Sequence, residues 1–344
     1  MSIKVLYSLL ILAIVAWFSP ASYAMGSLPE KFYHNPILQM ENLADPHMIK
    51  FQGKYYLYGT FLDGSLKGGS DHYDVYVSDD MANWKKTNNI FSKNTDTLWA
   101  PDVFYDTSNN TFYLYYSEDL SIGVAISESP TGPFIDKGIL IENAIDAHMF
   151  YDNGEYYLYY SSIEISDEFD MIFRFINGLI TGTNDKAREN ILVQKMRTPT
   201  EKIGEAILLI EPDSAWEKGI MLDVVEGAWM FKNDNTYYLM YSGNEAMFGT
   251  YAVGYATSDN PLGPFVKVEN NPIIHTRNSL FDRGVYSPGH HSVLTEEDGR
   301  HWIIYHQKKT PTSIGFSHRF VCKDEMFISE EGILSVLSTG MRKL

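Results

Sequence analysis

Cysteine and positive charge are both scarce in this sequence. The 344 residues include one cysteine, Cys322, so no disulfide can form within the chain, and stability must come from a packed core. A lone cysteine in a strand-like run is typical of a small buried apolar residue. Lysine and arginine number 27 against 44 aspartates and glutamates, which gives a net charge of −17. This charge argues against nucleic acid and anionic membrane surfaces as partners.

Long apolar runs are scarce as well, with one exception at the N-terminus. Residues 5–18 are almost entirely apolar, but 14 residues are short for a membrane span, which takes roughly 20. Lys4 before this run and the small residues that end at Ala24 are typical of a signal peptide cleaved after Ala24. The alternative is an N-terminal membrane anchor. We therefore predict a signal peptide over residues 1–24, export to the periplasm or the extracellular space, and no membrane contact after cleavage.

Motifs of several other enzyme classes are missing. The sequence has no Gly-Xaa-Ser-Xaa-Gly elbow and no cysteine–histidine pair for acyl transfer, and no glycine-rich loop that would cradle a phosphate. Aromatic residues are abundant, with 24 tyrosines, 19 phenylalanines and 6 tryptophans. This composition suits β-sheet cores and sugar stacking equally well.

An internal repeat of five copies runs along the chain. Each copy has a polar or acidic head, a short apolar run, a turn with glycine or asparagine, and a tyrosine-rich run. Both runs alternate with period two, which indicates a β-hairpin. The five pairs of runs cover residues 44–49 and 53–60, 100–105 and 111–117, 145–151 and 154–161, 225–231 and 236–243, and 287–293 and 299–306.

Five copies of three or four strands predict an all-β chain that folds as a five-bladed β-propeller. A β-sandwich would give less regular repeats, and a parallel β-helix has a much shorter repeat. An insertion near residues 164–204 lengthens the third copy, and we interpret it as longer strands plus a surface loop. No linker divides the sequence, so residues 25–344 are expected to form a single domain.

The heads of the five copies are the candidate functional residues. In a propeller, equivalent residues of successive blades lie in a ring around the channel, so the heads are expected at one rim. Carboxylates crowded there raise the pKa of some members, which keeps a general acid protonated near neutral pH. Glycoside hydrolysis needs such a pair, one carboxylate to activate water and one to protonate the leaving oxygen. The five heads are Asp45, Asp102, Asp146, Glu226 and His290.

Five short motifs, in this order, resemble those of glycoside hydrolase family 43. That family contains β-xylosidases, α-L-arabinofuranosidases, endo-arabinanases and exo-galactanases. The resemblance implies a five-bladed propeller, hydrolysis with inversion, and no cofactor for the chemistry. The motifs are AlaAspPro at 44–46, TrpAlaProAsp at 99–102, IleAspAla at 145–147, GluGly at 226–227 and ProGlyHisHisSer at 288–292.

The resemblance also implies a role for each matching carboxylate. Asp45 would be the general base that activates water, and Glu226 the general acid. Asp146 would be the third carboxylate, which orients Glu226 and keeps its pKa high.

Four further residues would bind substrate by the same resemblance. Asp102 and Trp99 would shape the sugar pocket, and Arg319 would contact the sugar. His290 would face the channel and hold a calcium ion or a water molecule, so a structural calcium in the channel is an expectation as well.

The predicted function is that of an exo-acting inverting glycosidase that releases α-L-arabinofuranose or β-D-xylose from a polysaccharide or oligosaccharide. Two alternatives stay open, namely an endo-arabinanase and a catalytically inactive propeller that binds glycans. A glycan-binding module has no need for an acid, a base and a third carboxylate at separate blade heads, which favours an enzyme. The sequence does not define the sugar, the linkage or the oligomeric state.

Overall fold

A computed structural model describes residues 34–62, 68–163, 186–278, 284–313 and 315–341. The predicted signal peptide lies outside these residues, as do residues 164–185 of the insertion in the third copy. The described residues form β-strands and one short 3-10 helix, η1 (Ala215–Glu217). Within them, no helix is long and apolar enough to cross a membrane. Residues 34–344 form one compact unit.

The strands form five consecutive antiparallel groups, one for each copy of the repeat. The first two groups contain β1 (Leu43–Phe51), β2 (Lys54–Phe61), β3 (His72–Ser78) and β4 (Lys85–Ser92), then β5 (Leu98–Asp106), β6 (Thr111–Glu118), β7 (Ser121–Ser127) and β8 (Ile135–Glu142). The third contains β9 (Ala144–Asp152), β10 (Glu155–Ile163) and β11 (Ala187–Thr198), with the short strands β12 (Glu201–Lys202) and β13 (Ile207–Ile210) paired to β11. The last two contain β14 (Leu222–Asn233), β15 (Thr236–Gly243), β16 (Ala252–Ser258) and β17 (Val266–Lys267), then β18 (Gly289–Thr295), β19 (His301–Lys308), β20 (Arg319–Ile328) and β21 (Leu334–Val336).

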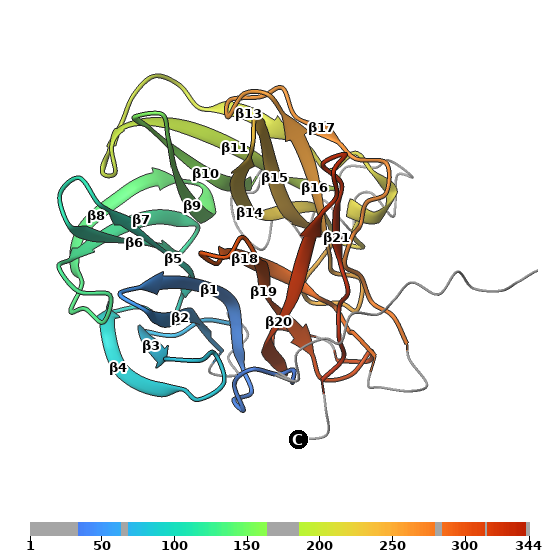
Figure 1. Ribbon diagram of the computed structural model, residues 1–344, viewed down its shortest axis with the longest axis horizontal. Helices are drawn as coiled ribbons and strands as arrows, with labels where there is room; N and C mark the ends of the chain where they lie inside the picture. The colour runs from blue at the N-terminus through green and yellow to red at the C-terminus, as the bar shows by residue number, and fades with distance from the viewer. Residues whose placement is uncertain (1–33, 63–67, 164–185, 279–283, 314, 342–344) are drawn as a thin grey trace, which may run out of the picture. The chain divides into compact units, whose positions relative to one another are not determined.

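The first strand of each group lies at the centre of the molecule. The strands β1, β5, β9, β14 and β18 contact one another in this order, and β18 contacts β1, so the ring closes. Figure 1 shows the five groups arranged as blades around this ring. The predicted five-bladed β-propeller is therefore confirmed. One feature of the sheets was not predicted: the third and fourth blades are joined by a short parallel pairing of β11 with β14, from Ala187 opposite Leu222 to Glu189 opposite Val224.

The core lies between successive blades, which explains why the second strands are rich in tyrosine. Four apolar clusters fill the spaces between blades one and two, two and three, three and four, and four and five. A second strand is covered on both faces, so β6 is buried along nearly its whole length. A buried tyrosine needs a partner for its hydroxyl. Tyr58, Tyr115 and Tyr159 donate to the carbonyls of Pro130, Pro199 and Pro261, each in the next blade, over 2.6–2.7 Å.

The N-terminal segment closes the ring against the fifth blade. The backbone N–H groups of Ile37 and Asn42 donate to carbonyls of β20 over 3.0 and 2.8 Å. The buried side chain of Asn35 donates to Thr339 Oγ1 over 2.9 Å and accepts from the N–H of Lys323 over 2.9 Å. These polar contacts fasten the start of the described chain to its end.

Candidate active site

All five central strands have an irregularity at the same place, near the start of the strand. The pairing register of each central strand with its second strand shifts there, which is the mark of a β-bulge. One residue of each bulge has a positive φ, a backbone conformation that side chains other than glycine rarely adopt. These five residues, which we call the bulge ring, are Asp45 (48°), Ala100 (45°), Asp146 (59°), Gly227 (59°) and His290 (44°).

The bulge ring corrects the sequence-based alignment of the five heads. Asp45, Asp146 and His290 are equivalent, as predicted. Glu226 precedes its ring position by one residue, and Asp102 follows its own by two. Each of the five bulges inserts one extra residue, so the blades share one register, and the polar residue of the head motif occupies a different position of it in the second and fourth blades.

Backbone N–H groups hold the bulge ring in place. In four of the five blades, the N–H of the ring residue donates to a side chain on the second strand of the preceding blade. The acceptors are Thr60 for Ala100 (2.7 Å), Ser117 for Asp146 (3.0 Å), Ser242 for His290 (2.8 Å) and the Nδ1 atom of His306 for Asp45 (3.3 Å). Burial lowers the pKa of His306, which suits a neutral imidazole that accepts a hydrogen bond.

The fourth blade departs from this pattern. Ser161 on β10 has the same register as the other acceptors, yet its buried hydroxyl has no partner among the described residues. The N–H of Gly227 donates instead to Asp146 Oδ2 over 3.2 Å. The fold therefore diverts one backbone donor to the carboxylate of Asp146.

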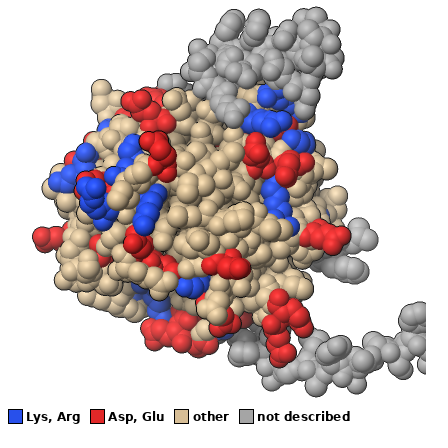
Figure 2. All heavy atoms as spheres, turned by 90° about the horizontal axis from the view of Figure 1, so that it is seen from above, with Lys and Arg blue, Asp and Glu red and all other residues tan. Residues whose placement is uncertain are grey.

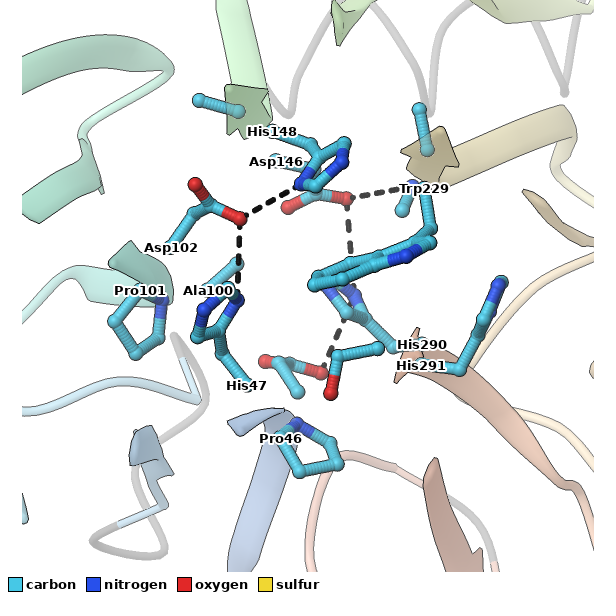
Figure 3. A pocket seen from close by; sticks show the side chains of 15 residues that line it. Pro46, His47, Ala100, Pro101, Asp102, Asp146, His148, Trp229, His290 and His291 are labelled. Carbon is cyan, nitrogen blue, oxygen red and sulfur yellow. Dashed lines mark hydrogen bonds and ion pairs between the residues drawn. The ribbon is translucent and has the colours of Figure 1, made fainter. Parts of the chain in front are cut away.

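Two of the predicted catalytic carboxylates lie on either side of His290. The Nδ1 atom of His290 is 3.4 Å from Asp45 Oδ1 and 3.8 Å from Asp146 Oδ2. Figure 3 shows the imidazole of His290 below the carboxylate of Asp146, with a dashed line between them. Asp45 also lies 3.4 Å from Nη1 of Arg319, which is buried at the start of β20. Two nitrogens of Arg319, Nε and Nη2, are buried and have no partner among the described residues.

The electrostatics of the site favour a protonated Glu226. Burial raises the pKa of Glu226 to about 7; the charge of Asp45 acts in the same direction, and the hydroxyl of Tyr251 and Arg319 act against it. Burial, with the nearby charges of Glu226 and Asp45, also raises the pKa of Asp146. Glu226 is half-buried, whereas Asp146 is buried. Glu226 is therefore the member of this pair that combines access to a ligand with a proton at neutral pH.

The ring of Tyr251 can lie beside Glu226 because Gly289, against which the ring packs, has no side chain. A Cβ atom on Gly289 would lie 2.0 Å from the ring of Tyr251, so any other residue there would displace the ring. The ring of Tyr251 also stacks on His306, with centroids 5.7 Å apart and an interplanar angle of 15°. The supporting residues of Glu226 and of Asp45 are thus packed against each other.

Asp102 lies further along the channel than the bulge ring and is enclosed by two histidines. Its Oδ1 atom is 3.1 Å from Nδ1 of His47 and 2.9 Å from Nδ1 of His148, and its Oδ2 atom accepts from the N–H of Met149. Although burial opposes it, the two histidines hold the pKa of Asp102 below its ordinary value. Trp229 stacks on His148 with centroids 4.0 Å apart. Figure 3 shows Asp102 between the two imidazoles. Both of its oxygens have partners within the protein, and a role of Asp102 in shaping the sugar pocket stays a prediction.

A cavity of about 20 Å³ lies between the bulge ring and this histidine cluster. It is large enough for one water molecule. Trp99 does not line it. Trp99 is half-buried and has in the second blade the register that Glu226 has in the fourth, opposite Ser117 and Ser242 respectively. Trp99 thus lies at the same level of the channel rim as Glu226, as a pocket-shaping residue would.

Three residues of the site were not predicted from the sequence: Glu189, Tyr251 and His306. Tyr251 is a buried residue directly before β16, His306 is a buried residue of β19, and Glu189 is on β11, the third strand of its blade. None of them is part of the head motif, and the sequence contains no signal that distinguishes them from core residues.

Comparison with known proteins agrees with this geometry. The profile of the family described as "Glycosyl hydrolases family 43" matches residues 33–334. A solved structure of a thermostable family-43 glycoside hydrolase superposes with a TM-score of 0.75 at 30% identity, covering 91% of this chain and 98% of the other. An endo-1,4-β-xylanase structure from Bacteroides thetaiotaomicron gives 0.71 at 28% identity, covering 87% and 95%.

Curated relatives share about a quarter of their residues with this chain. The β-D-galactofuranosidase xynD of Aspergillus niger is 24% identical, over 84% of this chain and 80% of its own length. A xylosidase/arabinosidase of Bacteroides ovatus is 25% identical, over 76% and 89%. An extracellular endo-α-(1→5)-L-arabinanase of Bacillus subtilis is 24% identical, over 82% and 68%. With its propeller, its rim of carboxylates and a family match over most of its length, the chain is a member of glycoside hydrolase family 43.

Proposed function

We propose that the protein is an exo-acting, inverting glycosidase that releases α-L-arabinofuranose or β-D-xylose. The observation that carries this proposal is the pair of solvent-reaching carboxylates at one rim, Asp45 from β1 and Glu226 from β14, with Asp146 behind them. Inversion requires a base and an acid on opposite sides of the scissile bond with room for water between them. Two carboxylates from blades that face each other across the ring meet this requirement.

The two carboxylates divide the chemistry between them. Asp45, positioned by Arg319, His290 and the N–H bond to His306, accepts a proton from the attacking water. Glu226 keeps its proton near neutral pH and transfers it to the leaving oxygen. Asp146 lies buried beside Glu226, and the N–H of Gly227 orients it; burial, with the charges of Glu226 and Asp45, raises the pKa of Asp146 itself.

The relatives support a pentose or a furanose as the sugar. Their names include a xylosidase/arabinosidase and a galactofuranosidase. An endo-arabinanase is the second candidate, because one relative with a comparable match has that name. Release of single sugars from short substrates, measured by chromatography, would distinguish exo action from endo action.

The leaving group provides the test of Glu226. General acid catalysis contributes about 10²–10⁴-fold, and it matters most when the leaving group is poor. Glu226→Gln is expected to lose most activity on an oligosaccharide and far less on a dinitrophenyl glycoside of the same sugar. Asp45→Asn is expected to impair both substrates alike, because water must be activated in either case. Equal loss on both substrates for Glu226→Gln would assign the acid to another residue.

The anomeric configuration of the first-formed product tests the assignment of Asp45. We expect proton NMR to show inversion, because Asp45 activates water and does not attack the sugar itself. Retention would mean that Asp45 is not the base.

The calcium expected at His290 is supported only weakly by its surroundings. Calcium takes six to eight oxygen ligands at about 2.3–2.6 Å. His290 faces two carboxylates, and the oxygens of Asp102 in the cavity below are already used. These residues fit a water molecule better than calcium, and no step of the mechanism requires a metal. We expect EDTA to change neither the melting temperature nor the rate; a loss of either that added calcium restores would establish the ion.

We also propose that the protein is exported, with cleavage after Ala24, and that it acts on a neutral carbohydrate.

The surface charge bears on the second of these proposals. Figure 2 shows acidic and basic side chains in small mixed groups over the face that it draws, with no broad basic area that would attract an anionic glycan there. The N-terminal sequence of the protein recovered from the periplasm or the medium tests the cleavage site. Activity on arabinan, xylan, galactan and their nitrophenyl glycosides tests the substrate, and failure on all of them would favour a glycan-binding role.

A further inference from the structure

Glu189 lies behind the general acid, at the seam between the third and fourth blades. In the parallel pairing of β11 with β14, Glu189 stands opposite Val224. Val224 precedes Glu226 by two residues on β14. On its other side, Glu189 pairs with Ile163 of β10. Its side chain is 2% exposed, so it has no access to a sugar. The unusual parallel seam is thus what brings a third-strand residue to the active site.

Three carboxyl groups meet at this point. Asp146, Glu189 and Glu226 each have an oxygen within 4.8 Å of the oxygens of the other two. In the described part of the chain, no lysine or arginine forms an ion pair with any of the three, and Glu189 Oε1 has no hydrogen-bond partner. An unpaired buried polar atom costs about 1–3 kcal/mol, so its persistence in an otherwise well-paired site requires an explanation.

The three groups cannot all be ionised. Like charges this close in a buried site keep at least one proton among them. Burial raises the pKa of Glu189 well above its ordinary value, and the charges of Glu226 and Asp146 raise it further. Glu189 is the most enclosed of the three and touches no cation. It therefore keeps its proton when Glu226 gives its own away, and its O–H is then a donor beside a new carboxylate.

We propose that Glu189 is a positioning residue of the acid–base site, whose carboxyl O–H donates a hydrogen bond to Glu226 from the side away from the sugar. This inference rests on the proposed role of Glu226 as general acid. The hydrogen bond holds Glu226 toward the leaving oxygen, and it strengthens as Glu226 becomes negatively charged during proton transfer. Glu189 thereby favours release of the proton from Glu226.

Two substitutions at Glu189 test this role. Glu189→Gln keeps the shape and an N–H donor, so we expect nearly normal kcat and an unchanged pH profile. Glu189→Met keeps the length but has no donor. A hydrogen bond to a charged group contributes about 1.5–3 kcal/mol, or roughly 10–100-fold. We expect Glu189→Met to lose about this factor in kcat on an oligosaccharide, with KM unchanged and with little loss on a dinitrophenyl glycoside.

The pH profile distinguishes positioning from a purely structural role. Without the donor, the carboxylate of Glu226 is less stable, its pKa rises, and the basic limb of kcat/KM moves to higher pH in Glu189→Met. A limb that stays in place in Glu189→Met would overturn the proposal. So would a limb that moves to lower pH in Glu189→Gln, because Glu189 would then be an ionised neighbour. The matched control is Glu217→Met, at a buried glutamate bonded by Tyr241 and Lys267 and separate from this cluster, which should leave the limb unchanged.

A second measurement covers the case in which Glu189→Met does not fold. Infrared difference spectra of the wild type against Glu189→Gln near pH 7 should show one protonated-carboxyl band of the wild type that the variant lacks. Absence of that band would overturn the proposal. A basic limb that depends on EDTA would also overturn it, because a divalent cation and not a proton would then hold the three carboxyls together. Loss of the leaving-group effect in Glu226→Gln, in contrast, would overturn the proposed function itself.

Discussion

At the scale of single residues, the carboxyl groups of this site differ mainly in how much solvent each one reaches. Asp45 and Glu226 are partly open, whereas Asp146 and Glu189 are buried. Burial is the largest cause of the raised pKa in Glu226, Asp146 and Glu189 alike. Asp45 and Glu226 can therefore exchange protons with water and sugar. Asp146 and Glu189 cannot reach the sugar and influence the reaction only through their effect on these two carboxyls.

Because Glu226 acts in its protonated form, activity should fall as the pH rises through its pKa of about 7. The hydroxyl of Tyr251 lowers this pKa. Tyr251→Phe removes the hydroxyl, so we expect the basic limb of kcat/KM to move to higher pH by up to about one unit. Tyr238→Phe, whose hydroxyl donates to Gly332 far from Glu226, is the control and should leave the limb unchanged. A shift to lower pH in Tyr251→Phe would contradict the assignment.

The sequence reveals only some of these residues. Asp45, Asp146 and Glu226 belong to short motifs at strand starts, where a carboxylate is conspicuous. Tyr251 and His306 look like ordinary strand residues, and Glu189 lies within the insertion of the third copy. Their positions depend on how the blades pack, and this packing leaves no local pattern in the sequence.

At the scale of elements, the bulge ring is the feature that turns five hairpins into a site. Each bulge places one residue in the ring around the channel. The backbone N–H of that residue donates a hydrogen bond to a side chain of the preceding blade, which holds it in place. Ser117 and Ser161 occupy equivalent positions on β6 and β10, but only Ser117 accepts such a bond. Substituting each of these two serines therefore separates the contribution of the hydrogen bond from that of the side chain itself.

We expect Ser117→Ala to reduce the free energy of unfolding by about 1–3 kcal/mol, because the buried N–H of Asp146 loses its acceptor. It should also lower kcat, since Asp146 is held less firmly. Ser161→Ala removes a hydroxyl that has no partner, so its effect should stay within about 0.5 kcal/mol. Denaturant unfolding of both variants measures the difference. Equal destabilisation would show that the N–H bond contributes nothing beyond packing.

The elements were easier to predict than their alignment. Period-two alternation and tyrosine-rich runs predicted all five hairpins. The same reasoning placed Asp102 level with Asp45 because it aligned the polar residues of the heads, whereas the residue equivalent to Asp45 in the second blade is Ala100. The parallel pairing of β11 with β14 was also beyond prediction, because β11 belongs to the insertion, which has no counterpart in the other copies.

At the scale of the whole molecule, closure of the ring depends on polar contacts instead of a disulfide. Asp324 on β20 accepts from the hydroxyl of Tyr305 over 2.6 Å and from Thr339 Oγ1 over 2.7 Å. Asn35 completes this group from the other end of the described chain. The repeat predicted how many blades there are, but it gave no information about how the first and last blades are joined.

Asn35→Ala should therefore weaken closure. It leaves the N–H of Lys323 without its acceptor, and we expect a loss of about 2 kcal/mol in the free energy of unfolding. Activity at low temperature should be little changed, because the catalytic residues are not touched. Asn94→Ala, at an exposed asparagine, is the control. A melting temperature equal to that of the wild type in both variants would mean that closure does not depend on Asn35.

The backbone of the bulge ring implies a compromise between stability and activity. Four of its five residues are not glycine, and each is held in a left-handed conformation that costs roughly 1–2 kcal/mol. The total is comparable with the net stability of an ordinary domain, which is about 5–15 kcal/mol. Glycine in place of Asp45 or Asp146 would relieve this strain and abolish the chemistry together. Selection of this enzyme for heat resistance alone should therefore tend to erase its catalytic rim, so a screen must require activity as well.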